Sequence, residues 1–214
     1  MNDSSIDRLL SPSNPFATHH VRAGMIPYRF DTVDEGENFF VLIGNNPWMG
    51  QIVGPHGTGK STLLKTLEPF FVDVGRVPIS FSLHNGQSRM PIIDWRAVGP
   101  DSQLIVDGYE QLRVSQRLWL QLRCKAAGCG LLVTTHRGVC GLPVIHRTSA
   151  TRSLVRSLVA ELVDEPLEEQ VIDSCFEQAA GNVRETFMLL YDAYATVARP
   201  LDKSPALQAV RSSS

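Results

Sequence analysis

The stretch GPHGTGKS, from Gly54 to Ser61, decides the fold of this chain. It matches the pattern G-x-x-x-x-G-K-[ST] at every fixed position. The residues before it, WMGQIVG, indicate a short strand, and the residues after it, GKSTLLKTLEPF, have the leucine spacing of a helix. A glycine-rich turn between a strand and a helix directs backbone N–H groups toward phosphate oxygens at the positive end of the helix. We therefore predict a phosphate-binding loop made of Gly54, Pro55, His56, Gly57, Thr58, Gly59, Lys60, Ser61 and Thr62.

This loop and its context resemble those of the P-loop NTPases. By the motif, Lys60 is expected to reach the β- and γ-phosphates, and the Ser61 hydroxyl is expected to bind Mg²⁺. The apolar segment LIVD, which ends at Asp107, fits the second acidic motif of these proteins. The resemblance thus implies ATP and Mg²⁺, with Ser61 and Asp107 at the metal. ATP is preferred to GTP because the sequence contains no N-K-x-D motif.

Apolar strands alternate with helices along the chain, which favours an α/β fold with a parallel sheet buried on both faces. We expect a three-layer P-loop NTPase core with about five strands, followed by a small helical lid. The expected parts are a disordered N-terminus with an extended arm (1–47), the ATPase core (48–150), the lid (151–198) and a disordered tail (199–214).

The extra strand expected near residues 76–83 resembles the division of P-loop ATPases that includes the AAA+, ABC and RecA-like families. In that division, a sensing polar residue ends the strand that follows the acidic one. The segment LLVTTH supplies Thr134, Thr135 and His136 at this place. Because side chains alternate along a strand, we expect Thr135 or His136 at the tip, and both are candidate catalytic residues. Thr134 serves equally well as an ordinary strand residue.

The residue after Asp107 departs from the usual ATPase pattern. In many ATPases a glutamate follows the aspartate and activates water, whereas here Gly108 follows and the nearest glutamate is Glu110. We expect hydrolysis, with Glu110 as the displaced base. The alternatives are that Gly108 marks weak intrinsic activity and that Glu110 is only a helix N-terminal acid.

Three families within P-loop proteins compete for the resemblance. AAA+ proteins place a helical lid after the core, and an arginine at the start of one lid helix often senses the γ-phosphate; GNVRE puts Arg184 there. ABC ATPases are suggested by LHNGQ (83–87), but too few residues precede it for their helical subdomain, and an Asn85–Gly86 hairpin explains it more simply. Adenylate kinases are suggested by Asp107–Gly108, but their arginine-rich mobile lid is missing. A small AAA+-type ATPase is the preferred interpretation.

The charge of the chain is unevenly distributed. Residues 111–160 carry no Asp or Glu but eight Arg and Lys residues, so with a net charge of −2 the remainder carries −10. Arg113 with Arg117, and Arg152 with Arg156, repeat at a helical spacing without a neighbouring acid. This pattern indicates an anionic partner, either DNA or an acidic protein, or the γ-phosphate of a neighbouring subunit in a homo-oligomer. The alternative for each arginine is a surface charge balanced by acids elsewhere in the fold. Arg137 and Arg147 are candidate arginine fingers.

The cysteines and the apolar segments indicate the compartment in which the protein is expected to function. The four cysteines, Cys124, Cys129, Cys140 and Cys175, lack the paired spacing of zinc modules, so we expect buried free thiols. No apolar run approaches the length of a membrane span, and the N-terminus lacks the features of a secretory signal, so we expect a cytoplasmic protein. The favoured function is a Mg-dependent ATPase that acts as a switch or motor on a macromolecular partner. The alternatives are a nucleotide-gated binding module and a small-molecule kinase.

Overall fold

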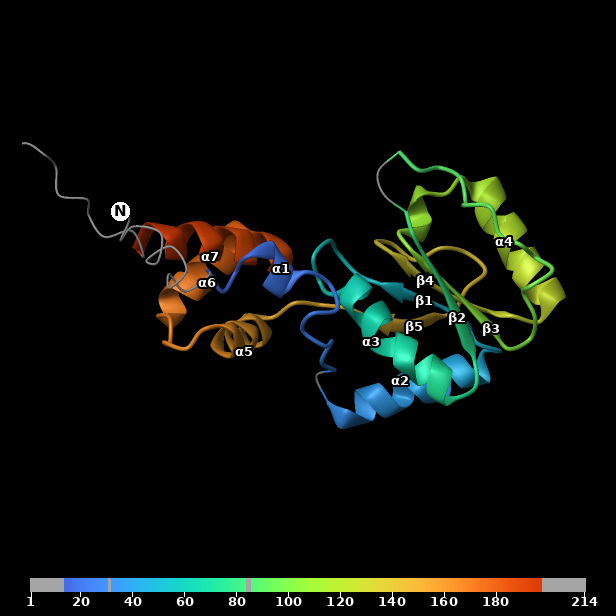
Figure 1. Ribbon diagram of the computed structural model, residues 1–214, viewed down its shortest axis with the longest axis horizontal. Coiled ribbons are helices and arrows are strands. Elements are labelled where there is room, and N and C mark those ends of the chain that lie inside the picture. Colours follow the sequence, from blue (N-terminus) through green and yellow to red (C-terminus); the bar gives the residue numbers. More distant parts are fainter. Residues whose placement is uncertain (1–13, 31, 84–85, 198–214) are drawn as a thin grey trace, which may run out of the picture.

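The computed structural model describes residues 14–30, 32–83 and 86–197. Five parallel strands form one sheet in the order β2-β3-β4-β1-β5, with helices on both faces (Figure 1). The strands are β1 (Met49–Val53), β2 (Val77–Ser82), β3 (Ser102–Asp107), β4 (Gly130–Thr135) and β5 (Val144–Arg147). The expected α/β class and the parallel sheet of five strands are confirmed.

The central strands are apolar on both faces because both faces are covered. In β3, Leu104 and Val106 belong to one core cluster, whereas Ile105 between them belongs to the other. Helix α4 (Val114–Ala127) covers the first cluster. Helices α2 (Val33–Asn45) and α3 (Lys60–Asp73) cover the second. A parallel sheet buried between two helical layers accounts for the absence of polar alternation in these strands.

The lid forms a separate helical lobe beside the core (Figure 1). It contains α5 (Arg152–Leu162), α6 (Glu169–Gln178) and α7 (Val183–Val197), which enclose their own apolar cluster. Thr151 caps α5 by accepting a hydrogen bond from the Leu154 amide, as Ser and Thr side chains do at helix N-termini. Pro166 is suited by its residue type to the first turn of a helix, but it lies before α6, which begins at Glu169.

The N-terminal segment differs in part from the predicted extended arm. It contains the short helix α1 (Thr18–Val21) and the full helix α2, so packed structure begins before residue 48. In α2, Phe39 and Ile43 lie four residues apart and are buried in the core, which explains why this segment is helical. Phe16 packs into the lid cluster instead of the core. The predictions for residues 1–13 and for the tail at 199–214 lie outside the described residues.

The predicted hairpin at Asn85–Gly86 is wrong. Its turn residues 84 and 85 lie outside the described part of the chain, but residues 86–101 contain no strand, and β2 pairs in parallel with β3. The amide of Met90 instead donates to the Gln116 side chain on α4 at 2.9 Å. Met90, Ile93 and Trp95 pack against the core cluster under that helix, so this segment follows α4 and does not fold back on β2.

The arginine pairs and the cysteines also require correction. Arg152 pairs with Glu177 and Arg156 with Asp173 and Glu169, all on α6, so acids distant in sequence neutralise both charges. The Arg117 guanidinium donates to the carbonyls of Leu112 and Glu110 at 2.8 and 2.6 Å. Cys124 and Cys129 are buried, whereas Cys140 is exposed and Cys175 is intermediate. In the described part of the chain, none of the helices has the length and apolar character needed to span a bilayer.

Candidate functional site

The candidate site lies at the carboxyl edge of the sheet. The loop after β1, the end of β3 and the end of β4 all meet there, because parallel strands place their C-terminal ends at one edge. The phosphate-binding loop leads from Gly54 into α3, whose N-cap Gly59 has a φ of 90°. The expected strand, loop and helix are therefore all present.

Lys60 is folded back onto its own loop. Its ammonium group donates to the carbonyl oxygens of Gly54 and Pro55, at 2.6 and 2.5 Å. Burial lowers the pKa of Lys60, and the negative charges of Glu110 and Asp107 oppose this shift. A phosphate group would offer the ammonium a stronger, charged acceptor than these two carbonyls.

Asp107 connects two of the site's strands with the helix that follows the loop. Its Oδ2 accepts a hydrogen bond from the Ser61 hydroxyl at 2.6 Å, and its Oδ1 accepts one from the Thr134 hydroxyl at 2.5 Å. Ser61 and Asp107, the two expected metal ligands, are thus in direct contact. A hydroxyl beside a carboxylate supplies the oxygen ligands that Mg²⁺ prefers.

The choice of Thr135 as the residue facing the site is wrong. Thr135 is completely buried, and its hydroxyl lies 3.3 Å from the Gln51 side-chain oxygen on the neighbouring strand. Thr134 instead contacts Asp107, because alternation along β4 sends consecutive side chains to opposite faces of the sheet. The alternation was visible in the sequence, but which face holds Asp107 was not.

Gly108 occupies a position that no glutamate suits. Its φ is +79°, and a Cβ added there would lie 2.5 Å from the carbonyl oxygen of Leu83, at the end of the neighbouring strand. The Leu83 amide donates to the Asp107 carbonyl at 2.9 Å, so this close approach belongs to the strand pairing itself. The glutamate that follows the aspartate in many ATPases is therefore excluded by the backbone at this position.

We predict that Gly108→Ala destabilises the protein by about 1–3 kcal/mol, because it adds a Cβ at positive φ against a fixed carbonyl. Thermal unfolding of the variant and the wild type measures this difference. Gly44→Ala is the matched control, since a Cβ there meets nothing within 4 Å inside helix α2 and is expected to stabilise slightly. Equal melting temperatures for Gly108→Ala and the wild type would contradict the account of Gly108.

Glu110 is an acid at this edge of the sheet. It lies on the short 3-10 helix η1 (Tyr109–Gln111), and its Oε1 is 3.2 Å from Nδ1 of His136 at the end of β4. Its other oxygen, Oε2, is buried and has no hydrogen-bond partner among the described residues. Buried carboxylate oxygens normally have a hydrogen-bond partner, so Oε2 is available to accept a hydrogen bond from a water molecule or a ligand.

His136 is in contact with both Glu110 and the phosphate-binding loop. Its ring lies against that of His56, with centroids 3.5 Å apart. Burial lowers the pKa of His136, and the positive charges of Lys60 and His56 act in the same direction, whereas Glu110 and Asp107 oppose it. The neutral imidazole therefore predominates at neutral pH, and its Nδ1–H is the donor that suits the carboxylate.

This lowered pKa predicts a pH dependence of stability. Between the folded pKa of His136 and the ordinary value of about 6.5, the unfolded state binds more protons, so stability falls as pH decreases through this window. When the pH is lowered from about 7.5 to about 5.5, we expect the melting temperature of the wild type to fall further than that of His136→Gln. Parallel pH profiles for the two proteins would contradict the prediction.

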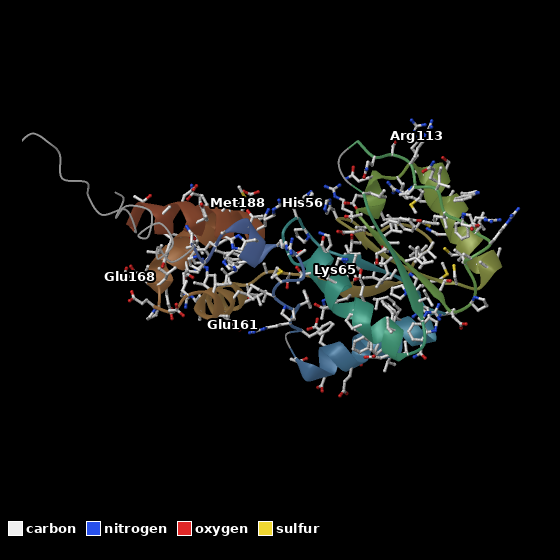
Figure 2. The ribbon with its side chains drawn as sticks, in the orientation of Figure 1. His56, Lys65, Arg113, Glu161, Glu168 and Met188 are labelled. Atoms are coloured by element: carbon white, nitrogen blue, oxygen red, sulfur yellow. The ribbon has the colours of Figure 1, made fainter. Side chains whose placement is uncertain are left out.

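The lid contacts the phosphate-binding loop directly. The amide of Val183 donates to the Gly57 carbonyl at 3.1 Å, and a Cβ on Gly57 would lie 1.7 Å from the Asn182 side-chain oxygen. That oxygen also caps α7 by accepting a hydrogen bond from the Glu185 amide, as Asn side chains do at helix N-termini. Arg184, exposed in the first turn of α7, therefore belongs to a helix that begins against the loop. Figure 2 shows His56 where the core faces the lid.

Comparison with known proteins supports this fold. No family profile and no curated protein sequence matches the chain. Among solved structures, the chain is similar to a single-substitution variant of RuvB from Thermotoga maritima, with a TM-score of 0.53 and 15% identity over 77% of this chain. The chain therefore shares the fold of this RuvB variant. It spans 61% of the length of that RuvB chain. It is also similar to PCH-2 of C. elegans, with a TM-score of 0.41 and 12% identity over 79% of this chain and 71% of that one.

Two further contacts join the phosphate-binding loop to distant segments. The Thr58 hydroxyl lies 2.7 Å from that of Thr148, which follows β5, and so ties the loop to an edge strand. The ring of Tyr28 lies over Gly59, and its hydroxyl is 2.9 Å from Nε2 of His146. A lone threonine carries no local signal of its contact, which depends on the order of the strands. Tyr28 belongs to an aromatic segment expected either to stack on adenine or to pack on the core, and it packs against the core.

Proposed function

We propose that the chain binds Mg·ATP at the loop of residues 54–62 and hydrolyses it, with Glu110 as the general base. The single observation that carries this proposal is the buried Glu110 Oε2 without a hydrogen-bond partner among the described residues. The negative charge of Glu110 raises the pKa of Lys60 and so opposes the effect of burial on that lysine. The carboxylate therefore lies near the lysine that is expected to bind phosphate, which supports hydrolysis. An acid held beside the phosphate-binding lysine is placed to accept a proton from water.

In this proposal each residue has a distinct role. Lys60 and the loop amides bind the phosphates, and Ser61 with Asp107 would hold Mg²⁺, which supplies positive charge to the phosphate oxygens. Thr134 fixes Asp107 through their hydrogen bond of 2.5 Å. Glu110 accepts a proton from the attacking water as the bond between the γ-phosphorus and the bridging oxygen breaks, which yields ADP and phosphate. His136 orients Glu110, and Arg184 is proposed to contact the γ-phosphate from the lid.

We propose that hydrolysis allows the chain to act as a switch or a motor on a macromolecular partner. The contact between Asn182 and Gly57 supports this, because the lid touches the loop at the place where phosphates would bind. A change at the loop would therefore reach the lid through a direct contact, without a long path through the core.

Phosphate release from Mg·ATP by the purified full chain tests the proposal. We expect turnover that stops on removal of Mg²⁺ with a chelator and returns when Mg²⁺ is added. Asp107→Asn should need more Mg²⁺ for any remaining activity, because an uncharged amide binds hard cations more weakly than a carboxylate does. A wild type that binds ATP but releases no phosphate in Mg²⁺ would overturn hydrolysis and leave a nucleotide-gated binding module.

A further inference from the structure

The outer face of α4 exposes a continuous row of aliphatic side chains. Val114, Leu118 and Leu122 have exposed fractions of 66%, 53% and 67%, although side chains of this kind are usually buried. They are spaced four residues apart, so they form one ridge along about 12 Å of the helix. Figure 1 shows α4 at the outside of the core, on the side away from the lid. The nucleotide site uses none of these three residues.

An aromatic and basic cluster adjoins this ridge. Trp119 is 47% exposed and packs edge-on against Trp95, with ring centroids 5.6 Å apart. The guanidinium of Arg123 lies 4.9 Å from the Trp95 ring and 5.9 Å from the Trp119 ring. Trp and Arg side chains are enriched among the residues that contribute most to protein–protein binding. Their stacking holds this cluster in one arrangement before any partner arrives.

The charge around the ridge is positive and unbalanced. Arg113, Arg123 and Lys125 lie on α4 or at its N-cap, and none of them forms an ion pair within the described residues. Figure 2 shows Arg113 at the periphery of the molecule, near the start of α4. In contrast, Arg152 and Arg156 are matched by acids of α6. Six basic residues of the segment 111–160 form no ion pair within the described residues. Four of them lie on α4 or at its N-cap (Arg113, Arg117, Arg123 and Lys125), and the other two are Arg137 and Arg147.

We propose that this face of α4 is a docking surface for an acidic amphipathic helix of another protein. A straight ridge of residues four apart fits the groove of a second helix. The flanking cations select acidic residues beside the apolar stripe of that helix. The aliphatic centre of the surface argues against nucleic acid, which would present phosphates to it.

Binding of designed peptides to the full chain tests this proposal. Two labelled helical peptides share one leucine stripe, and the flanking positions carry glutamate in one and lysine in the other. We expect the glutamate peptide to bind at least about tenfold more tightly than the lysine peptide, with an affinity that falls as salt is added. Leu118→Glu combined with Leu122→Glu should weaken its binding at least about tenfold. Val41→Glu, at a valine on α2 that is 58% exposed, is the matched control and should bind like the wild type.

Several outcomes would overturn the docking proposal. These are equal affinity for the two peptides, and unchanged binding by the Leu118→Glu, Leu122→Glu variant. Tighter binding of phosphatidylserine vesicles or of a single-stranded oligonucleotide, lost in the same variant, would assign the face to a membrane or to nucleic acid. Self-association of the wild type that the variant loses in sedimentation would assign it to a second copy. Because the substituted side chains are exposed, the variant should retain the wild-type melting temperature, and ATP turnover plays no part in the readout.

Discussion

Glu110→Gln is expected to reduce phosphate release from Mg·ATP by about 10²–10⁴-fold and to leave ATP binding nearly unchanged. The amide keeps the size of the side chain and can still bond with His136, which lies 3.2 Å from the carboxylate in the wild type. It cannot accept a proton from water, so only the chemical step is lost. Single-turnover phosphate release and fluorescent-nucleotide binding, measured on the same preparation, separate the two effects.

Glu168→Gln is the matched control for that variant, because Glu168 lies on the lid, far from the phosphate-binding loop (Figure 2). It should keep wild-type turnover. If Glu110→Gln also keeps it, Glu110 is only a structural acid at the start of η1. The assignment of the general base would then be wrong, even if Lys60 proves essential.

Lys60→Ala is expected to weaken ATP binding by roughly 10–150-fold, since a hydrogen bond to a charged group contributes about 1.5–3 kcal/mol. Phosphate release should become undetectable, because the same ammonium is proposed to stabilise charge that develops on the phosphates during transfer. Equilibrium binding of a fluorescent ATP analogue gives the first quantity, and phosphate release gives the second.

Lys65→Ala, on the same helix, is the control for the lysine variant. Its ammonium pairs with Glu68 at 3.0 Å on the exposed side of α3, so its loss should change neither binding nor turnover. The carbonyls of Gly54 and Pro55 lose their donor in Lys60→Ala, and a thermal melt shows whether the loop still folds. A well-folded Lys60→Ala protein with wild-type turnover would contradict the proposed function.

Local pattern by itself determined much of this protein. Helix α4 occupies Val114–Ala127 and strand β4 occupies Gly130–Thr135, which match the segments VSQRLWLQLRCKAA and GLLVTT, whose residue patterns indicate a helix and a strand. Gly128 ends the helix with a φ of 70°, a conformation that glycine adopts without strain. The phosphate-binding loop was equally plain, because its glycines, lysine and serine are close in sequence. Such features depend on side-chain periodicity and backbone conformation within a few residues.

Tertiary structure alone decided the contacts between distant segments. The sequence favoured Thr135 or His136 as the residue that faces the site, whereas the placement of β3 beside β4 brings Thr134 to Asp107. Gly108 looked like a missing glutamate, whereas the approach of Leu83 from the neighbouring strand shows that only glycine fits there. The charges of Arg152 and Arg156 seemed unbalanced until α6 brought acids to them. Strand order and helix docking bring these groups together, and neither is encoded in the spacing of nearby residues.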